Sequence, residues 1–180
     1  MAHQAQANFC IKVQHMFPEY FYNKKVLDCG SLELNASFKP LFTNCLYIGI
    51  DISEGANVDF VSLIHEFNMP NESFDTILSC ETFEHDMYYE KSLRNICRLL
   101  KSSGLFFFTC AAPGREEHGT LNCLSHSSPF TSKIPEWCNY YKNLTEEDIR
   151  KTIDIDNIFQ KYEFSGNDDP HDLYFWGIKR

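Results

Sequence analysis

Two acidic residues, Asp28 and Asp51, each stand at the end of a short apolar run. Apolar runs of this length, separated by turns or short helices, predict parallel strands of an α/β sheet. The carboxyl ends of such strands lie at the edge where open α/β sheets bind their ligands. A carboxylate there suits two vicinal hydroxyls or an ammonium group, because charge-assisted hydrogen bonds are the strong ones. The two residues therefore predict a ligand site, with an ordinary strand–turn–helix that binds nothing as the alternative.

A second group of candidate residues follows the segment FDTILSC, residues 74–80, which predicts another strand. In an open sheet whose strand order reverses between the first and fourth strands, residues just past both strand ends face one crevice. Cys80 and Glu81 are therefore expected to lie opposite Gly30. His85 follows shortly after them, and an imidazole with an unperturbed pKa of about 6.5 can accept a proton at neutral pH. A role in capping the loop is the alternative for His85.

The other elements are predicted from hydrophobic period and turn signals. Phe9, Val13 and Phe17 predict an amphipathic helix within residues 1–24, which Pro18 ends or kinks. Strands are expected at residues 26–29, 46–50, 59–61, 74–80, 105–109, 158–164 and 173–179, and helices at 37–42, at 89–101 with a stop at Ser103 and Gly104, and after a capping box that begins at Thr145.

The pattern of the first two strands resembles the class I S-adenosylmethionine-dependent methyltransferases. Residues 28–31, DCGS, resemble their first motif, an acidic residue and a Gly-rich turn, and Asp51 matches the acidic residue that holds both ribose hydroxyls in that family. The longer string GSLELN resembles one branch of the family. Leu32 and Leu34 replace glycines of the usual motif, and Asn35 is expected to take the left-handed conformation that a glycine would otherwise supply.

The resemblance implies a Rossmann-like, doubly wound, mostly parallel sheet of seven strands in the order 3-2-1-4-5-7-6, with the last strand antiparallel. It implies S-adenosylmethionine as methyl donor and S-adenosylhomocysteine as product, with O- or N-methyl transfer. Because Leu63 stands where the family often has an Asp, the adenine is expected to meet backbone groups or apolar contacts near Ile64 and His65. The cofactor-binding residues that it indicates are Asp28, Gly30, Ser31, Asp51, Ile52, Ile64, His65, Cys80 and Glu81.

A long segment, residues 111–143, is rich in Gly, Pro, Ser, Asn and His and leaves the end of a predicted strand. Loops longer than ~15 residues in a compact domain are usually functional, so this segment predicts a substrate-binding insert or lid. Its string GREEHGT also resembles that branch of methyltransferases. Glu84 and His85 match an acid–histidine pair of the family. His85 and His118 are the expected bases for a hydroxyl acceptor, and Glu84, Arg115 and Tyr140 the expected substrate contacts.

Composition narrows the possible partners. The 180 residues carry a formal net charge of −9, which argues against a surface that follows nucleic-acid phosphates with clustered Lys and Arg. The eight cysteines form no CxxC pair and are interpreted as reduced thiols, so no metal site is predicted. No leader is seen at the N-terminus, and no apolar stretch approaches the ~20 residues that span a bilayer. We expect one cytoplasmic domain, residues 1–180, with no nucleic-acid or membrane partner and no indicated oligomeric state.

Two alternatives accompany the methyltransferase hypothesis, whose expected acceptor is a small molecule or a sugar. A nicotinamide dehydrogenase needs the string GxGxxG after the first strand, which this chain lacks, and Asp28 would repel its phosphates. A catalytically degenerate methyltransferase fold, kept as a binding or scaffold protein, is favoured by the replaced glycines and by Leu63. Binding of the donor without turnover would identify this second alternative.

Overall fold

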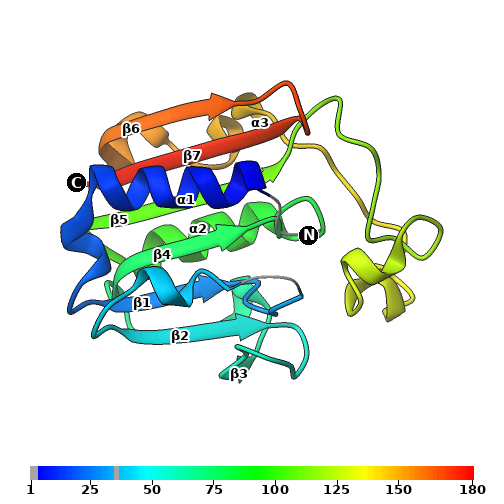
Figure 1. Cartoon of the computed structure of the whole chain (residues 1–180), viewed down its shortest axis with the longest axis horizontal. Helices are drawn as coiled ribbons and strands as arrows, with labels where there is room; N and C mark the ends of the chain where they lie inside the picture. Colours follow the sequence, from blue (N-terminus) through cyan, green and yellow to red (C-terminus); the bar gives the residue numbers. More distant parts are fainter. Residues whose placement is uncertain (1–3, 35–36) are drawn as a thin grey trace.

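A computed structural model describes residues 4–34 and 37–180, which form one seven-stranded sheet with helices on both faces (Figure 1). The strands lie in the order β3-β2-β1-β4-β5-β7-β6. Their bounds are β1 Lys25–Cys29, β2 Leu46–Asp51, β3 Phe60–Val61, β4 Phe74–Cys80, β5 Leu100–Ala111, β6 Phe159–Gly166 and β7 Asp172–Lys179. All neighbours pair in parallel except β7, which is antiparallel to both β5 and β6. The predicted fold class is confirmed.

Two helices bury the faces of the central strands. Helix α1, Gln4–Met16, crosses one face, and α2, Tyr89–Leu99, covers the other (Figure 1). Successive side chains of β5 point to opposite faces of the sheet. Phe107 packs in the hydrophobic cluster on the α1 face, whereas Phe106 and Phe108 pack in the cluster on the α2 face. This double burial explains why the strand sequences are apolar runs rather than alternating ones.

The C-terminal part completes the sheet as expected. Helix α3, Glu146–Thr152, begins with the predicted capping box: the Thr145 side chain accepts from the backbone N–H of Asp148 at 3.2 Å, and the Asp148 carboxylate accepts from the backbone N–H of Thr145 at 2.9 Å. A short helix that the sequence did not predict, α4 Ile155–Ile158, then leads into β6.

Three expected boundaries are corrected. Helix α2 does not continue to Ser103 and Gly104, because Leu100 pairs with Phe74 and already begins β5. The expected helix at 37–42 is only the 3₁₀ turn Lys39–Leu41, with Pro40 inside it. The third strand is confined to Phe60–Val61. The expected left-handed Asn35 lies outside the described residues.

The segment between β5 and α3 contains only two 3₁₀ turns, Ser125–Ser127 and Thr131–Lys133. Figure 1 shows it beyond the carboxyl ends of β1, β2 and β4, on the side to which their arrows point. No helix among the described residues is long and apolar enough to cross a membrane. The fold thus places the longest irregular segment at the edge where a ligand is expected.

The aromatic core on β7 gives a stability prediction. Phe175 is fully buried and its ring lies 4.7 Å from that of Phe164 and 5.3 Å from that of Phe108. Phe175→Ala should lower the free energy of unfolding by about 3–5 kcal/mol, because it leaves a cavity between β5, β6 and β7. Urea titration followed by circular dichroism measures the change. Phe60→Ala, at a ring that is 54% exposed, is the control and should change stability by about 1 kcal/mol or less.

Candidate functional site

A pocket opens at the carboxyl ends of β1, β2 and β4, where the insert passes over them. The cofactor-binding residues expected from the sequence line this pocket with the exception of His65: they are Asp28, Gly30, Ser31, Asp51, Ile52, Ile64, Cys80 and Glu81. Parallel pairing of β1 with both β2 and β4 brings these residues together, although they lie far apart in the chain. Residues at the carboxyl ends of neighbouring parallel strands thus line one pocket, as expected for an open α/β sheet.

Asp51, at the end of β2, is held by the turn that follows β1. One carboxylate oxygen accepts from the backbone N–H of Ile52 at 2.7 Å, and the other accepts from the backbone N–H of Leu32 at 3.1 Å. Burial raises the pKa of Asp51, while these two hydrogen bonds act in the opposite direction. The carboxylate is thus fixed in orientation at the pocket wall, and its remaining lone pairs can accept from a ligand.

Asp28, at the end of β1, is buried and accepts a 2.7 Å hydrogen bond from the hydroxyl of Tyr47. Burial raises the pKa of Asp28 to about 7; the Tyr47 hydrogen bond opposes this shift, and the negative charge of Asp51 adds to it. A cationic ligand group in the pocket would favour the ionised form.

Gly30 turns the chain away from β1 with a φ of +81°, which a glycine adopts without strain. A Cβ at this position would lie 2.1 Å from the hydroxyl oxygen of Thr82, so the space that Gly30 leaves is filled by Thr82. Ser31 donates to the backbone carbonyl of Asn57 at 2.9 Å. These contacts hold the first turn against the loops after β2 and β4.

His65 does not join the described residues that line the pocket. Its ring lies 4.7 Å from the ring of Tyr88, whereas Leu63 and Ile64 line the pocket. The expected backbone and apolar surface near Ile64 is therefore present, and the side chain of His65 points elsewhere. These neighbours could not be separated from the sequence, because the segment is irregular and has no period that sets the side-chain directions.

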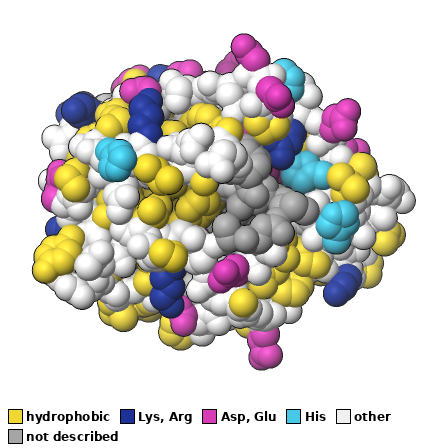
Figure 2. All heavy atoms as spheres, viewed as in Figure 1, with side chains coloured by type: hydrophobic (Ala, Val, Ile, Leu, Met, Phe, Trp, Pro, Cys, Tyr) yellow, Lys and Arg dark blue, Asp and Glu magenta, His cyan; other side chains and the backbone are white. Residues whose placement is uncertain are grey.

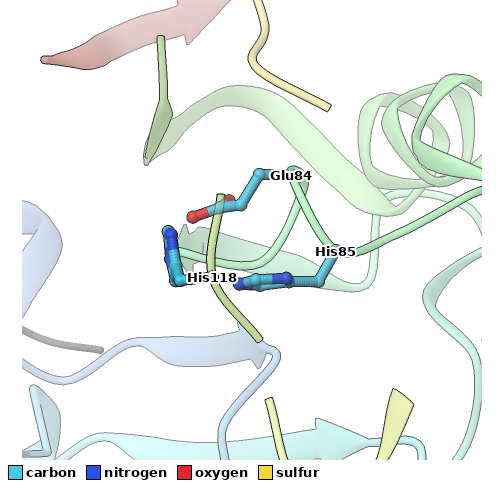
Figure 3. A group of neighbouring side chains, drawn as sticks. All are labelled: Glu84, His85 and His118. Atoms are coloured by element: carbon cyan, nitrogen blue, oxygen red, sulfur yellow. The ribbon is translucent and has the colours of Figure 1, made fainter. Parts of the chain in front are cut away.

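Glu84, His85 and His118 form a buried cluster beside the pocket (Figure 3). One side-chain nitrogen or oxygen atom from each residue lies within 4.8 Å of those of the other two, and the rings of His85 and His118 stand edge to face with centroids 5.0 Å apart. Glu84 and His85 follow β4, whereas His118 comes from the insert. Of the three, only His85 also lines the pocket. The structure thus joins both expected bases and one expected substrate contact.

Burial dominates the electrostatics of this cluster. It lowers the pKa of His85 well below the usual range, with the neighbouring His118 adding to the shift, and it also lowers the pKa of His118. Burial and the negative charge of Glu81 raise the pKa of Glu84 well above the usual range. Because the pKa values of both histidines are lowered, both imidazoles are neutral at neutral pH. The Nδ1 of His118 lies 3.0 Å from the backbone carbonyl oxygen of Glu116.

Arg115 and Tyr140, the other expected substrate contacts, are not among the described residues that line the pocket. Arg115 forms an ion pair with Asp172 at 2.8 Å and lies 3.7 Å from Glu81. It thus connects the insert to β7 and to the end of β4. Tyr140 is half-buried, and burial raises its pKa to about 12. Their proposed contacts with a substrate stay predictions.

The pocket also has lining residues beyond the expected cofactor-binding set. Asp86 is buried and accepts from the backbone N–H of Tyr88 at 2.8 Å and from the hydroxyl of Ser92 at 2.5 Å. From the insert come Ser127, Ser128, Pro129, Phe130, Thr131 and Trp137. The indole N–H of Trp137 donates to the backbone carbonyl of His85. Turn-rich composition predicted an insert, but nothing local in the sequence indicates which of its residues return to the pocket.

Comparison with known proteins gives one family match. Residues 27–108 match the family model described as "Methyltransferase domain". No curated protein sequence matches the chain. The matched part contains both strand-end carboxylates and runs from Leu27 in β1 to Phe108 in β5. The matched part is less than half of the chain, and together with the fold it supports a methyltransferase-like domain.

Solved structures share the fold at low sequence identity. One is the 1,6-didemethyltoxoflavin N1-methyltransferase of Burkholderia thailandensis with bound 1,6-didemethyltoxoflavin and S-adenosylhomocysteine: TM-score 0.63, 14% identity, 97% of this chain and 78% of that chain covered. Another is phosphoethanolamine N-methyltransferase 2 of Haemonchus contortus with phosphomonomethylethanolamine and S-adenosylhomocysteine: TM-score 0.65, 15% identity, 96% and 52% covered. This chain spans about half the length of the Haemonchus protein.

A SAM-dependent methyltransferase from Archaeoglobus fulgidus has nearly the same extent as this chain. Its TM-score is 0.60 at 15% identity, with 97% of this chain and 94% of that chain covered. At such identities the likeness establishes the methyltransferase fold over almost the whole chain.

The distribution of charge bears on the expected partners. On the face drawn in Figure 2, Lys and Arg side chains stand apart from one another among acidic and hydrophobic ones. That face therefore offers no continuous basic surface of the kind that follows nucleic-acid phosphates.

The environment of Asp28 predicts a pH dependence. The native state keeps this carboxyl protonated up to a pH of about 7, whereas the unfolded chain releases the proton at a pH of about 3.9. Between these values the native state binds more protons, so this residue makes the free energy of unfolding fall as the pH rises. Between pH 5 and pH 8, the free energy of unfolding should decrease by about 2–3 kcal/mol less in Asp28→Asn than in the wild type. Urea titrations of both proteins at the two pH values measure it.

Tyr47→Phe is the companion variant. It removes the hydrogen bond that favours the ionised carboxyl of Asp28. The free energy of unfolding should therefore keep falling to a higher pH than in the wild type. Identical pH dependence in the wild type and Asp28→Asn would show that Asp28 ionises normally.

Proposed function

We propose that this protein transfers a methyl group from S-adenosylmethionine to a small-molecule acceptor. The observation that carries the proposal is the convergence of two strand-end carboxylates, Asp28 and Asp51, in one pocket of a methyltransferase fold. The family match and the S-adenosylhomocysteine bound in two structural neighbours support the same donor.

The lining residues fit this donor by their chemistry. The fixed carboxylate of Asp51 is suited to accept from both ribose hydroxyls. Asp28 is suited to the ammonium of the methionine part, whose positive charge offsets the cost of ionising a buried carboxyl. Leu63 and Ile64 offer apolar surface for the adenine. When bound, the donor supplies a methyl group activated by a sulfonium.

The protein's own part in the reaction is proximity and alignment. Residues of the insert, among them Phe130 and Trp137, line the same pocket as Asp51 and would exclude water from it. The bond from Trp137 to the backbone of His85 ties the insert to the end of β4. We assign the acceptor to the region beside His85, with an oxygen or nitrogen as the methylated atom.

Removal of the acceptor's proton is assigned to the histidine cluster. His85 lines the pocket, and His118 packs against it. A neutral imidazole is the form that accepts a proton, and burial keeps both rings neutral. Glu84, Arg115 and Tyr140 stay proposed substrate contacts.

Small molecules are the favoured acceptors. Two structural neighbours are methyltransferases with a bound small molecule, 1,6-didemethyltoxoflavin in one and phosphomonomethylethanolamine in the other. A pocket roofed by an insert of the same chain suits a compact acceptor better than a polymer. The resemblance of the GREEHGT string to its branch favours a sugar among compact acceptors. We also propose a cytoplasmic location, since the eight cysteines are free thiols.

Ligand-induced stabilisation tests the cofactor. S-adenosylhomocysteine at about 100 times its dissociation constant should add about 2.7 kcal/mol of stability, since it binds only the native state. For a chain of this length the melting temperature should rise by about 5–10 °C. Differential scanning fluorimetry measures the shift, and Asp51→Ala should abolish most of it.

Asp168→Ala, at an exposed carboxylate away from the pocket, is the matched control and should keep the full shift. NADH should give no shift. Stabilisation that survives in Asp51→Ala would contradict the assigned ribose site. A shift without turnover on any acceptor would favour the degenerate binding protein instead.

A further inference from the structure

The cluster of Glu84, His85 and His118 contains polar atoms that have no partners in the described part of the chain. Both carboxylate oxygens of Glu84, both ring nitrogens of His85 and Nε2 of His118 are buried and have no hydrogen-bond partner among the described residues. The three residues are 0%, 5% and 6% exposed. Buried polar groups are nearly always hydrogen-bonded or bound to a ligand, because desolvation without compensation is costly.

We propose that Glu84, His85 and His118 bind a divalent transition-metal ion, with Zn²⁺ as the ion of best-matched chemistry. Imidazole nitrogens and a carboxylate oxygen are ligands that zinc prefers, and two histidines with one glutamate leave a coordination position open. An ion at the centre of the cluster would give each unpartnered side chain a partner. No metal site was predicted from the sequence, because that prediction considered only the spacing of the cysteines. None of the three ligands proposed here is a cysteine.

A hydrogen bond at Nδ1 of His118 leaves Nε2 of the same ring free to bind a metal ion. Its Nδ1 lies 3.0 Å from the carbonyl oxygen of Glu116, which can only accept, so Nδ1 carries the proton. Nε2 then presents its lone pair toward Glu84 and His85. An imidazole whose other nitrogen donates to a carbonyl is the usual outer-shell arrangement of a metal-binding histidine.

The spacing of the ligand atoms suits an ion after a small adjustment. They lie within 4.8 Å of one another, whereas tetrahedral bonds of about 2.0–2.2 Å place zinc ligands about 3.4 Å apart. Movement of each side chain by about 1 Å or less, through its own torsions, closes that difference. Figure 3 shows the Glu84 carboxylate and the His85 ring both turned toward His118.

A divalent ion at this position would favour the ionised form of Glu84, which is the form that binds a metal.

The position of the site links it to the proposed reaction. Because His85 lines the pocket, an ion bound to it lies at the pocket wall. The open coordination position would take a hydroxyl of the acceptor and lower its pKa, so that the proton passes to solvent water before methyl transfer and neither imidazole has to act as the base. This role rests on the proposed function, whereas the ion site itself rests only on the cluster.

Zinc binding to the isolated protein tests the site. Protein freed of metal with a chelator is titrated with ZnCl₂ by calorimetry, and bound zinc is counted after dialysis. The wild type should retain one zinc ion more than Glu84→Gln and His118→Ala. Each variant should weaken this binding by more than about 100-fold, because loss of outer-shell partners alone costs 10–100-fold.

His15→Ala is the matched control, since it removes an exposed histidine at the end of α1 and should bind zinc as the wild type does. Glu84→Gln has nearly the same volume as the wild-type residue, so its fold is checked by circular dichroism and its melting temperature without zinc. Zinc should raise the melting temperature of the wild type but not that of Glu84→Gln.

Equal zinc content and affinity in the wild type and both cluster variants would overturn the site, because the ions would then sit on other residues such as the free cysteines. Absence of any bound zinc in the wild type would overturn it too. The stabilisation by S-adenosylhomocysteine is measured on zinc-free protein, so its failure would count against the proposed function and not against the ion site.

Discussion

The reversal of strand order at β1 is the constraint on which the site depends. Strands β2 and β4 both pair with β1 in parallel, so the connections that leave β1 and β4 turn to opposite faces of the sheet and a crevice opens between them. The chain places carboxylates at two of the strand ends around this crevice. If β4 paired elsewhere, Asp28 and Glu81 would not face one pocket.

Burial then turns these polar groups into a chemically distinctive site. Asp28, Asp51 and Glu84 each have a raised pKa, chiefly because packed strands and the insert remove them from water. The site therefore combines a methyltransferase-like crevice with a cluster in which several buried polar atoms have no hydrogen-bond partner among residues 4–34 and 37–180. Such groups carry a stability cost that a bound ligand can offset. Burial of large aromatic side chains on both faces of the sheet stabilises the fold and offsets this destabilisation.

Prediction from the sequence was most accurate where local pattern and tertiary environment agree. The run at β4, residues 74–80, was bounded correctly, and the capping box at Thr145 was placed correctly, because both depend on near neighbours in the chain. The stop at Ser103 and Gly104 was wrong because pairing of Leu100 with Phe74 overrides a local glycine signal. His65 and Ile64 could not be distinguished, since the direction of a side chain in an irregular segment depends on its packing.

The sequence by itself determined which segments form strands, the carboxylates at their ends and the presence of a long insert, because these follow from apolar runs and turn residues that act locally. The order of the strands in the sheet was implied only by the family resemblance. Only the tertiary structure decided which insert residues reach the pocket and that His118 meets Glu84 and His85. Those contacts join segments that are distant in the chain and have no periodic signal. The physical reason is that burial and mutual distance are properties of the packed molecule, and they decide which polar groups become a site.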